Sequence, residues 1–257
     1  MHLPSSPAPG TLETQGRLLF LPTASAEAQA RLSSEAYTAW KTSVDWITQW
    51  IAGPVTKPNP YGSVTKEESV CRFSPPALQL GFMLFAIAQP TNPNSLDAIY
   101  AELYHFADIF ESLNPKEYPK NKLKNINVIF PNTPDSVFAQ LDGDKVDPNV
   151  RMDLYKRGIM FANANPSCNY RAKFDPTVFA MRAPVPLFSI RTFVEQDWHL
   201  TSVVPEFRQI YIERFGQPPV DNPYTGLKGW WHDTCYRTRE CLKPIKQVVK
   251  KLLGRHE

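Results

Sequence analysis

The residues from Phe82 to Phe130 carry clear signals for a strand, a helix and a second strand. This stretch opens with Phe-Met-Leu-Phe-Ala-Ile-Ala at 82–88, an uninterrupted apolar run whose length is typical of a buried strand. Ser95 is then placed as the N-cap of a helix with a strongly periodic apolar stripe. This stripe consists of Leu96, Ile99, Tyr100, Leu103, Phe106 and Phe110. A polar loop follows, and Ile-Asn-Val-Ile-Phe at 126–130 predicts a second buried strand.

Helical periodicity also marks the region before this stretch. From Ala26 to Ala52, large apolar residues recur on one side of a helix, which Gly53-Pro54 ends. They are Tyr37, Trp40, Val44, Trp46 and Trp50. The spacing therefore predicts a helix with an aromatic buried face.

The region after the second strand contains both helix and strand signals. Asp147-Pro148 is a typical helix start, an N-cap followed by proline in the first turn, and we expect this helix to run towards Met160-Phe161. Residues 177–181 and 187–192 predict a hairpin that bends at Ala183-Pro184-Val185-Pro186.

The order of these elements indicates the fold class. Helical segments near 197–215 and 231–253 close the chain, and Pro205 is expected to start or kink the first of them. Because strands and helices alternate irregularly, we predict an α+β fold with a small mixed or antiparallel sheet flanked by helices. The Pro-, Ser- and Gly-rich residues 1–25 predict a loose N-terminal arm, and residues 26–257 a single α+β domain.

The composition excludes several function classes. Of 257 residues, 42% are hydrophobic and 21% are charged, which is typical of a globular chain. Neither GxGxxG nor GxxxxGK[ST] occurs, which argues against a glycine-rich phosphate loop. A net charge of +3, with no basic block before the last helix, argues against a nucleic-acid partner. No apolar run reaches the roughly 20 residues of a membrane span, so no membrane partner is expected.

The N-terminus and the cysteines indicate the compartment. The first residues lack the basic and then apolar order of a signal peptide, so a cytoplasmic protein is expected. The four cysteines are too scattered for a disulfide framework, and no CxxC pair occurs. They are Cys71, Cys168, Cys235 and Cys241. We therefore expect free thiols.

Cys71 is the first candidate functional residue. It lies between an irregular loop and the apolar strand, and it is followed by an arginine and by two prolines. A cysteine held on a loop against an apolar wall fits a heme-thiolate ligand, which needs a fixed sulfur and little water. A buried structural cysteine is the alternative.

Several motifs give the span from Gly53 to about Gly216 a family resemblance. The segments are Val70-Cys71-Arg72-Phe73, Asn165-Pro166-Ser167-Cys168, Met181-Arg182-Ala183-Pro184-Val185-Pro186 and Ser189-Ile190-Arg191. In that order they resemble a bacterial domain family of unknown function that recurs near natural-product genes. Its members share a Cys-Pro-Phe element, a His-Pro-x-x-Cys-like element and an Arg-Ser-Pro-Val-Pro stretch that leads to Ile-Arg. More distantly, the order resembles the YqcI/YcgG family, which includes heme-dependent N-oxygenases that act on the guanidine group of arginine-like substrates.

The distant resemblance implies a function and a cofactor. It implies a heme-thiolate oxygenase of specialised metabolism that holds heme b through Cys71 and acts on a small nitrogen-bearing, arginine-like metabolite. An external electron donor is expected, because no flavin or nicotinamide fingerprint is present. Two positions depart from the family pattern. Arg72 replaces the family's proline, where it could reach a heme propionate, and Asn165 replaces the family's histidine.

The arginines around the proline-rich bend are further candidates. Arg182 and Arg191 present donor pairs suited to carboxylates, so they are expected to clamp heme propionates or a substrate carboxylate. Pairing with an acid such as Asp175 or Asp197 is the alternative. Cys168 either faces the same cavity or is buried without a function.

Two pairs of residues leave other hypotheses about the function open. Trp231 and His232 either roof a cofactor pocket or pack the last helix onto the body of the protein. Glu102 and His105 have the Glu-x-x-His spacing of di-iron carboxylate sites, although no second copy occurs. The alternatives to a heme enzyme are therefore a non-heme di-iron oxygenase and a heme-free binding or scaffold protein of a biosynthetic pathway.

Overall fold

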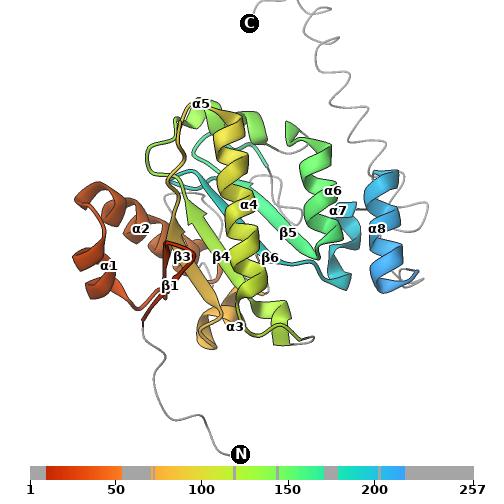
Figure 1. Ribbon diagram of the computed structural model, residues 1–257, viewed down its shortest axis with the longest axis horizontal. Coiled ribbons are helices and arrows are strands. Elements are labelled where there is room, and N and C mark those ends of the chain that lie inside the picture. The colour runs from red at the N-terminus through yellow and green to blue at the C-terminus, as the bar shows by residue number, and fades with distance from the viewer. Residues whose placement is uncertain are drawn as a thin grey trace, which may run out of the picture. The chain divides into compact units, whose positions relative to one another are not determined.

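A mixed six-stranded sheet is the central element of the computed structural model, which describes residues 10–53, 71, 73–117, 120–142, 145–170, 179–201 and 204–217. The strands lie in the order β1-β2-β3-β4-β6-β5 (Figure 1). They are β1 (Thr11–Thr14), β2 (Arg17–Phe20), β3 (Met83–Ile87), β4 (Asn125–Ile129), β5 (Ile159–Ala164) and β6 (Leu187–Thr192). β3 and β4 are parallel, and the other neighbouring pairs are antiparallel.

Helices precede, connect and follow these strands. The α-helices are α1 (Ser25–Arg31), α2 (Ser34–Trp46), α3 (Ser74–Gln79), α4 (Leu96–Ser112), α5 (Asp135–Phe138), α6 (Pro148–Lys156), α7 (Trp198–Thr201) and α8 (Pro205–Phe215). The shorter turns are the π-helix η1 (Ile47–Ile51) and the 3₁₀-helices η2 (Lys120–Leu123), η3 (Ala139–Leu141) and η5 (Glu195–Asp197). The side chains of Ser33, Ser95 and Asp147 each accept a backbone N–H in the first turn of α2, α4 and α6, and these caps fix the helix starts.

The two faces of the sheet pack against different helices. Successive strand residues point to opposite faces, so Ile126 and Val128 of β4 pack with α4, whereas Ile129 packs with α2. Figure 1 shows α4 in front of the sheet. The opposite face carries a second group of buried apolar residues, here called the α2-side cluster. It consists of Phe20, Ala24, Ala28, Ala39, Trp40, Val44, Trp46, Ile47, Trp50, Ile51, Ala77, Met83, Phe85, Ile129, Ala164, Ala180, Ala183 and Leu187.

The chain divides into two compact units, Met1–Val194 and Glu195–Glu257. The first unit holds the whole sheet described above. In the second unit, the rings of Trp198 and Tyr211 have centroids 4.9 Å apart, and Tyr211 Oη donates to the Glu195 carbonyl at 2.7 Å. These contacts join α7 to α8. Within the described ranges, no helix is long and apolar enough to cross a membrane.

The predicted fold class is confirmed: the protein is α+β, with a small mixed sheet flanked by helices. The strands expected within 82–88 and 126–130 are β3 and β4. The periodic helix capped by Ser95 is α4. The segment expected near 197–215 forms α7 and α8, and Pro205 starts α8 as predicted. The helix expected near 231–253 lies outside the described residues.

The expectation of a loose arm is wrong for residues 11–20. These residues form the β1–β2 hairpin, and β2 pairs with β3. Gln15 and Gly16 have positive φ values of 48° and 73°, which a two-residue turn between twisted strands requires. Leu19 and Phe20 are fully buried, so burial against distant strands orders a segment that lacks a local signal.

Two expectations around β5 are also wrong. The helix that starts at Asp147 ends at Lys156 instead of running to Phe161, because Gly158 adopts a left-handed φ of 79° and β5 begins directly after it. In addition, residues 187–192 form no hairpin with 179–181, the part of the expected first strand that the structure describes. Strand β6 is already paired on both edges, with β4 and β5, so no hydrogen-bonding edge remains for a third strand.

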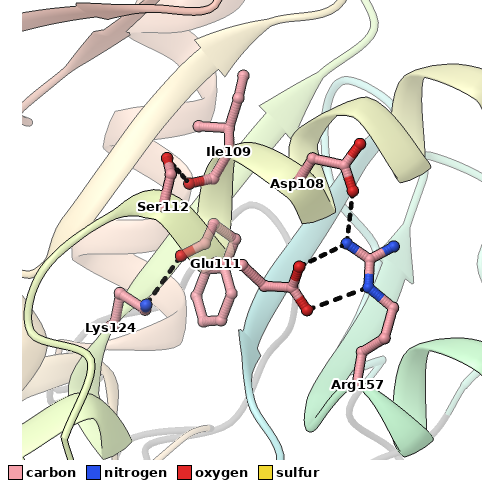
Figure 2. Close-up of polar contacts among 7 residues, drawn as sticks. Asp108, Ile109, Glu111, Ser112, Lys124 and Arg157 are labelled. Carbon is pink, nitrogen blue, oxygen red and sulfur yellow. Dashed lines mark hydrogen bonds and ion pairs between the residues drawn. The ribbon is translucent and has the colours of Figure 1, made fainter.

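Polar contacts fix the C-terminal end of α4 (Figure 2). Lys124 is buried, and its ammonium group donates to the carbonyl oxygens of Phe110 at 2.8 Å and Leu113 at 3.0 Å. Arg157, which follows α6, pairs with Asp108 at 2.5 Å and Glu111 at 2.9 Å on α4. These contacts hold α4 and the α6–β5 turn together on one side of the sheet.

Candidate functional site

Cys71 lies between the π-helix η1 and helix α3. Its backbone N–H donates to the Ile51 carbonyl at 3.3 Å, and its own carbonyl accepts the Ser74 N–H at 3.0 Å. The side chain is partly buried and packs against the α2-side cluster. The thiol therefore lies at the border of an aromatic cluster, on a backbone held at both ends.

Arg191 of β6 is positioned beside this segment. Its guanidinium carbon is 5.7 Å from the centroid of the Phe73 ring, and Nη1 donates to the Thr192 carbonyl at 3.0 Å. Arginine over an aromatic face gains a cation–π attraction. The structure thus brings Arg191 next to Phe73, which lies two residues along the chain from Cys71.

A row of polar side chains continues from Arg191 across the same face of the sheet. Asn125 is paired with Arg191, and Asn127 with Ser189, in the register of β4 and β6. Asn127 Nδ2 donates to Asn125 Oδ1 at 2.7 Å, and Asn125 Nδ2 donates to Ser189 Oγ at 2.8 Å. Both asparagines are at least 93% buried, with 7% and 2% exposed. Opposite Ser189, Ala162 of β5 is exposed, so this polar row ends at an accessible position.

Helix α2 and η1 contribute unpartnered donors to the α2-side cluster. The indole Nε1 atoms of Trp40, Trp46 and Trp50 and the Ser43 hydroxyl are buried and have no hydrogen-bond partner within the described part of the chain. These four residues are at most 2% exposed. A buried polar group left unpaired costs about 1–3 kcal/mol, so four in one cluster call for an explanation. A π-helix such as η1 frequently marks a functional site.

Asn165, Cys168 and Arg182 form a separate group. Asn165 and Arg182 form an isolated β-bridge, and the Cys168 N–H donates to the Asn165 carbonyl at 3.2 Å. Asn165 Nδ2 donates to Asp142 Oδ1 at 2.6 Å, and Arg182 Nη2 donates to Asn169 Oδ1 at 3.2 Å. The structure therefore brings three of the predicted pocket residues together.

The thiol of Cys168 is poorly suited to act as a thiolate. Burial is the main cause that raises its pKa to about 11, and the nearby Asp142 carboxylate raises this pKa further. The Arg182 guanidinium acts in the opposite direction but does not compensate. At neutral pH Cys168 is therefore a protonated thiol, which is a weak ligand and nucleophile.

The two groups lie at opposite ends of β5 and β6. Arg191 is opposite Met160 at the start of β5, whereas Asn165 directly follows the last β5 residue, Ala164. Four strand residues span roughly 13 Å, so Arg182 and Arg191 are not brought together as one clamp. Three further predicted residues, Arg72, Trp231 and His232, lie outside the described residues.

Glu102, the acid of the alternative di-iron hypothesis, belongs to a different arrangement. One carboxylate oxygen pairs with Arg17 and the other accepts the Gln89 N–H at 3.0 Å. His105 lies edge-on to the Phe106 ring, with centroids 5.8 Å apart. Among the described residues, no group of three or more His, Cys, Asp or Glu side chains is placed to hold a metal ion.

Sequence reasoning missed Asn125 and Asn127 as site residues. The signal was present, because Asn-Ile-Asn-Val-Ile places two amides at a period of two in an otherwise apolar strand. Both amides must then face the same side of the sheet, where burial requires polar partners. The tryptophans of α2 and η1 were predicted as a buried face, but their unpaired N–H groups could not be read from spacing.

The fold and the site define an α+β protein with an aromatic cluster that is rich in unpaired donors and bordered by a cysteine. A family model described as "Domain of unknown function (DUF6875)" matches residues 43–223, more than half of the chain. The chain belongs to this family. This confirms the prediction that it is a member of a family of unknown function. The match includes Cys71, the polar row from Asn125 to Arg191, and three of the four residues with unpartnered donors, Ser43, Trp46 and Trp50. Comparison with curated proteins and with solved structures finds no match.

Proposed function

We propose that this protein is a heme-thiolate oxygenase in which Cys71 ligates the iron of heme b, and that it acts on a small nitrogen-bearing metabolite. The observation that carries the proposal is the position of Cys71. Its side chain is partly exposed at the border of the α2-side cluster, where buried donors lack acceptors. The distant resemblance to heme-dependent N-oxygenases supports the substrate class.

The residues around Cys71 fit such a cofactor. Heme b is a flat apolar ring with two carboxylates, and the cluster that Cys71 borders is rich in aromatic residues and holds unpaired indole N–H donors. Arg191 adds a cation next to Phe73 on the same side of the sheet. Cys168, the other cysteine in the described ranges, is nearly fully buried and has a raised pKa, so it is the weaker candidate ligand.

The residues of this chain would have three tasks. Cys71 would hold the iron, and the backbone contacts to Ile51 and Ser74 would keep its sulfur in place. The aromatic cluster would exclude water, and Arg191 with the polar row would orient polar groups of the bound molecules. When bound, a thiolate-ligated heme supplies the activation of dioxygen, with electrons from an external donor.

The absorption spectrum of the protein expressed with a heme precursor tests this proposal. We expect a Soret band and, in the ferrous–CO state, the strong red shift that is typical of thiolate ligation. Cys71→Ala should abolish the red-shifted band, and Cys168→Ala should leave it unchanged. Wild-type protein without bound heme would refute the proposal, and an unaltered spectrum in Cys71→Ala would refute the ligand assignment.

A heme-free binding protein is the second candidate, and the polar row favours it. The chain of hydrogen bonds from Asn127 through Asn125 to Ser189 needs no metal to recognise a polar molecule at the exposed Ala162. The same spectrum separates the two candidates. Protein that lacks a Soret band but binds small polar molecules would favour this second function.

A further inference from the structure

Two groups of opposite charge lie near Cys168 without pairing with each other. Asp142 directly follows η3, and Arg182 forms an isolated β-bridge with Asn165, the residue after β5. The charges of Asp142 and Arg182 act on the pKa of the Cys168 thiol in opposite directions, so both lie near that sulfur. Neither belongs to an ion pair among the described residues. These four residues are here called the Cys168 cluster.

Neutral partners hold the Asp142 carboxylate in place. Its Oδ1 accepts hydrogen bonds from Asn163 Nδ2 at 3.0 Å and from Asn165 Nδ2 at 2.6 Å. Asn165 is fully buried, and its Oδ1 accepts both the N–H and the hydroxyl of Ser167 at 3.0 Å, which fixes the orientation of this amide. Because both donors to Asp142 are neutral, they orient its negative charge without compensating it.

The guanidinium group of Arg182 is held in a similar way. Its Cζ lies 3.7 Å from the centroid of the Phe179 ring, and Nη2 donates to Asn169 Oδ1 at 3.2 Å. An aromatic ring and a neutral amide orient this group and leave its positive charge without an anion. Arginine has five N–H donors, so most of them remain for a further partner.

Both charged groups lie at the surface of the protein. Asp142, Asn163 and Arg182 are partly exposed. Ser167 and Asn169, which bond to Asn165 and Arg182, are exposed. A ligand therefore contacts the cluster directly from solvent and needs no path through the core.

The separation of these charges selects the kind of ligand. A partly buried charge loses hydration, and an ion pair is the usual compensation. A single ligand compensates both groups if it carries a carboxylate for Arg182 and a cation for Asp142. An α-amino acid carries both charges on one carbon atom. The charge of Asp135 also acts on Cys168, so a second carboxylate favours an ammonium group at this place.

We propose that the Cys168 cluster binds a free α-amino acid, with its carboxylate on Arg182 and its ammonium group on Asp142. This site goes beyond the proposed function, because it lies at the other end of β5 from Arg191 and uses no heme. Asn165 is then a positioning residue, since it orients the carboxylate of Asp142.

Matched sets of small molecules test the need for both charges. The first set is l-alanine, propionate and ethylamine, the second is l-leucine, isocaproate and isoamylamine, and the third is l-phenylalanine, hydrocinnamate and phenethylamine. In each set the acid lacks the ammonium group and the amine lacks the carboxylate. Isothermal titration calorimetry on the full chain at neutral pH measures each Kd. We expect the amino acid of at least one set to bind about tenfold or more tightly than both relatives. The absence of such a preference in all three sets would refute the site.

Two variants assign the two charges. In Arg182→Gln the preference for the amino acid over the amine should fall towards one, whereas its preference over the acid should remain. Asp142→Asn keeps an oxygen for the two amide donors, and it should abolish only the preference over the acid. Loss of structure would remove both preferences together. Arg31→Gln and Asp97→Asn are matched controls, since they remove exposed charges elsewhere and should leave both preferences unchanged. Preferences that persist in both test variants would contradict the assignment.

The outcomes separate this inference from the proposed function. If an amino acid binds through Arg182 and Asp142 but no Soret band appears, the heme assignment fails and the amino-acid site stands. If heme binds through Cys71 but no set shows the preference, the amino-acid site is refuted. It is also refuted if the preference is lost in Cys71→Ala and kept in Arg182→Gln, because the amino acid then binds at the other end of the sheet.

Discussion

At the residue scale, the two cysteines of the first unit differ in exposure. Cys71 is partly exposed at the border of the α2-side cluster, whereas Cys168 is 3% exposed and its pKa is raised to about 11, mainly by burial. Alkylation requires a thiolate and access for the reagent. The environment of each sulfur therefore determines its reactivity.

We predict that iodoacetamide modifies Cys71 before Cys168 in the folded, heme-free protein. Cys168 should react at least about tenfold more slowly and reach the rate of Cys71 only after unfolding in denaturant, when burial no longer raises its pKa. Peptide mapping by mass spectrometry at several time points measures both rates. Equal rates in the folded protein would contradict the burial described here, and hemin should protect Cys71 selectively.

Lys124 is a second residue with a pH-dependent role. Burial, with a smaller contribution from the charge of Lys116, lowers its pKa from 10.5 to about 8. Its ammonium group donates to the carbonyl oxygens of Phe110, in the last turn of α4, and of Leu113, which directly follows the helix. It also lies 4.3 Å from the Phe110 ring centroid. The group is thus both a helix C-cap and a buried charge.

Replacement of Lys124 by methionine should lower the free energy of unfolding at neutral pH by about 1–3 kcal/mol, because the hydrogen bonds from its ammonium group to two carbonyl oxygens are lost. The pKa of Lys124 is lower in the folded state, so the unfolded chain binds more protons between about pH 8 and 10.5. Over this range the wild type should gain stability relative to Lys124→Met as the pH rises. Urea unfolding at both ends of the range measures this difference in the free energy of unfolding. Lys156→Met, at an exposed lysine, is the control, and its stability relative to the wild type should not change with pH in this way.

At the element scale, local periodicity accounts for the elements that were predicted correctly. Helix α4 shows its apolar stripe in the sequence, and β3 and β4 are apolar runs of strand length. The β1–β2 hairpin was missed because each strand has only four residues and its partner β3 lies more than 60 residues later. β5 was missed because a continuing helical pattern hides the stop at Gly158, whose left-handed φ is visible only in the structure.

The candidate site was predictable to a similar extent. Cys71 and the tryptophan stripe are visible in the sequence, since their signals lie within one segment each. The position of Arg191 beside Asn125 depends on the register of β4 and β6, which are far apart in the sequence, and no local pattern specifies that register. The same pairing separates Arg191 from Arg182, which sequence reasoning had placed in one clamp.

A buried ion pair ties the N-terminal hairpin to helix α4. Arg17 of β2 pairs with Glu102, whose side chain is 9% exposed, whereas the pair of Arg31 and Glu13 is largely exposed. Loss of one partner leaves a buried charge in the first case only. The two pairs therefore provide a matched comparison.

We predict that Arg17→Met lowers the free energy of unfolding by about 3 kcal/mol, because the Glu102 carboxylate then keeps only the Gln89 N–H. Arg31→Met should cost less than about 1 kcal/mol, as is usual for exposed pairs. Chemical denaturation measures both values. The double variant of Arg17→Met with Glu102→Leu should recover much of the loss, and failure to recover would mean that packing rather than charge dominates.

At the scale of the whole molecule, the sheet has two different faces. The face towards α4 is a continuous apolar core, in which Ile126, Val128 and Ile190 are fully buried. The face towards α2 combines aromatic residues with the polar row and the unpaired donors. An apolar face stabilises the fold. A face with unpaired buried donors costs folding free energy, and such a cost is common at binding sites.

Hydrogen exchange measured by mass spectrometry should report this asymmetry. The slowest amides are expected in β4, which is buried at all five positions and lies between β3 and β6, and the fastest strand amides in the edge strand β1. Addition of hemin should slow exchange more strongly in η1 and α3, which flank Cys71, than in α4. Slowing that is confined to α4 and absent from η1 and α3 would place the ligand on the other face of the sheet.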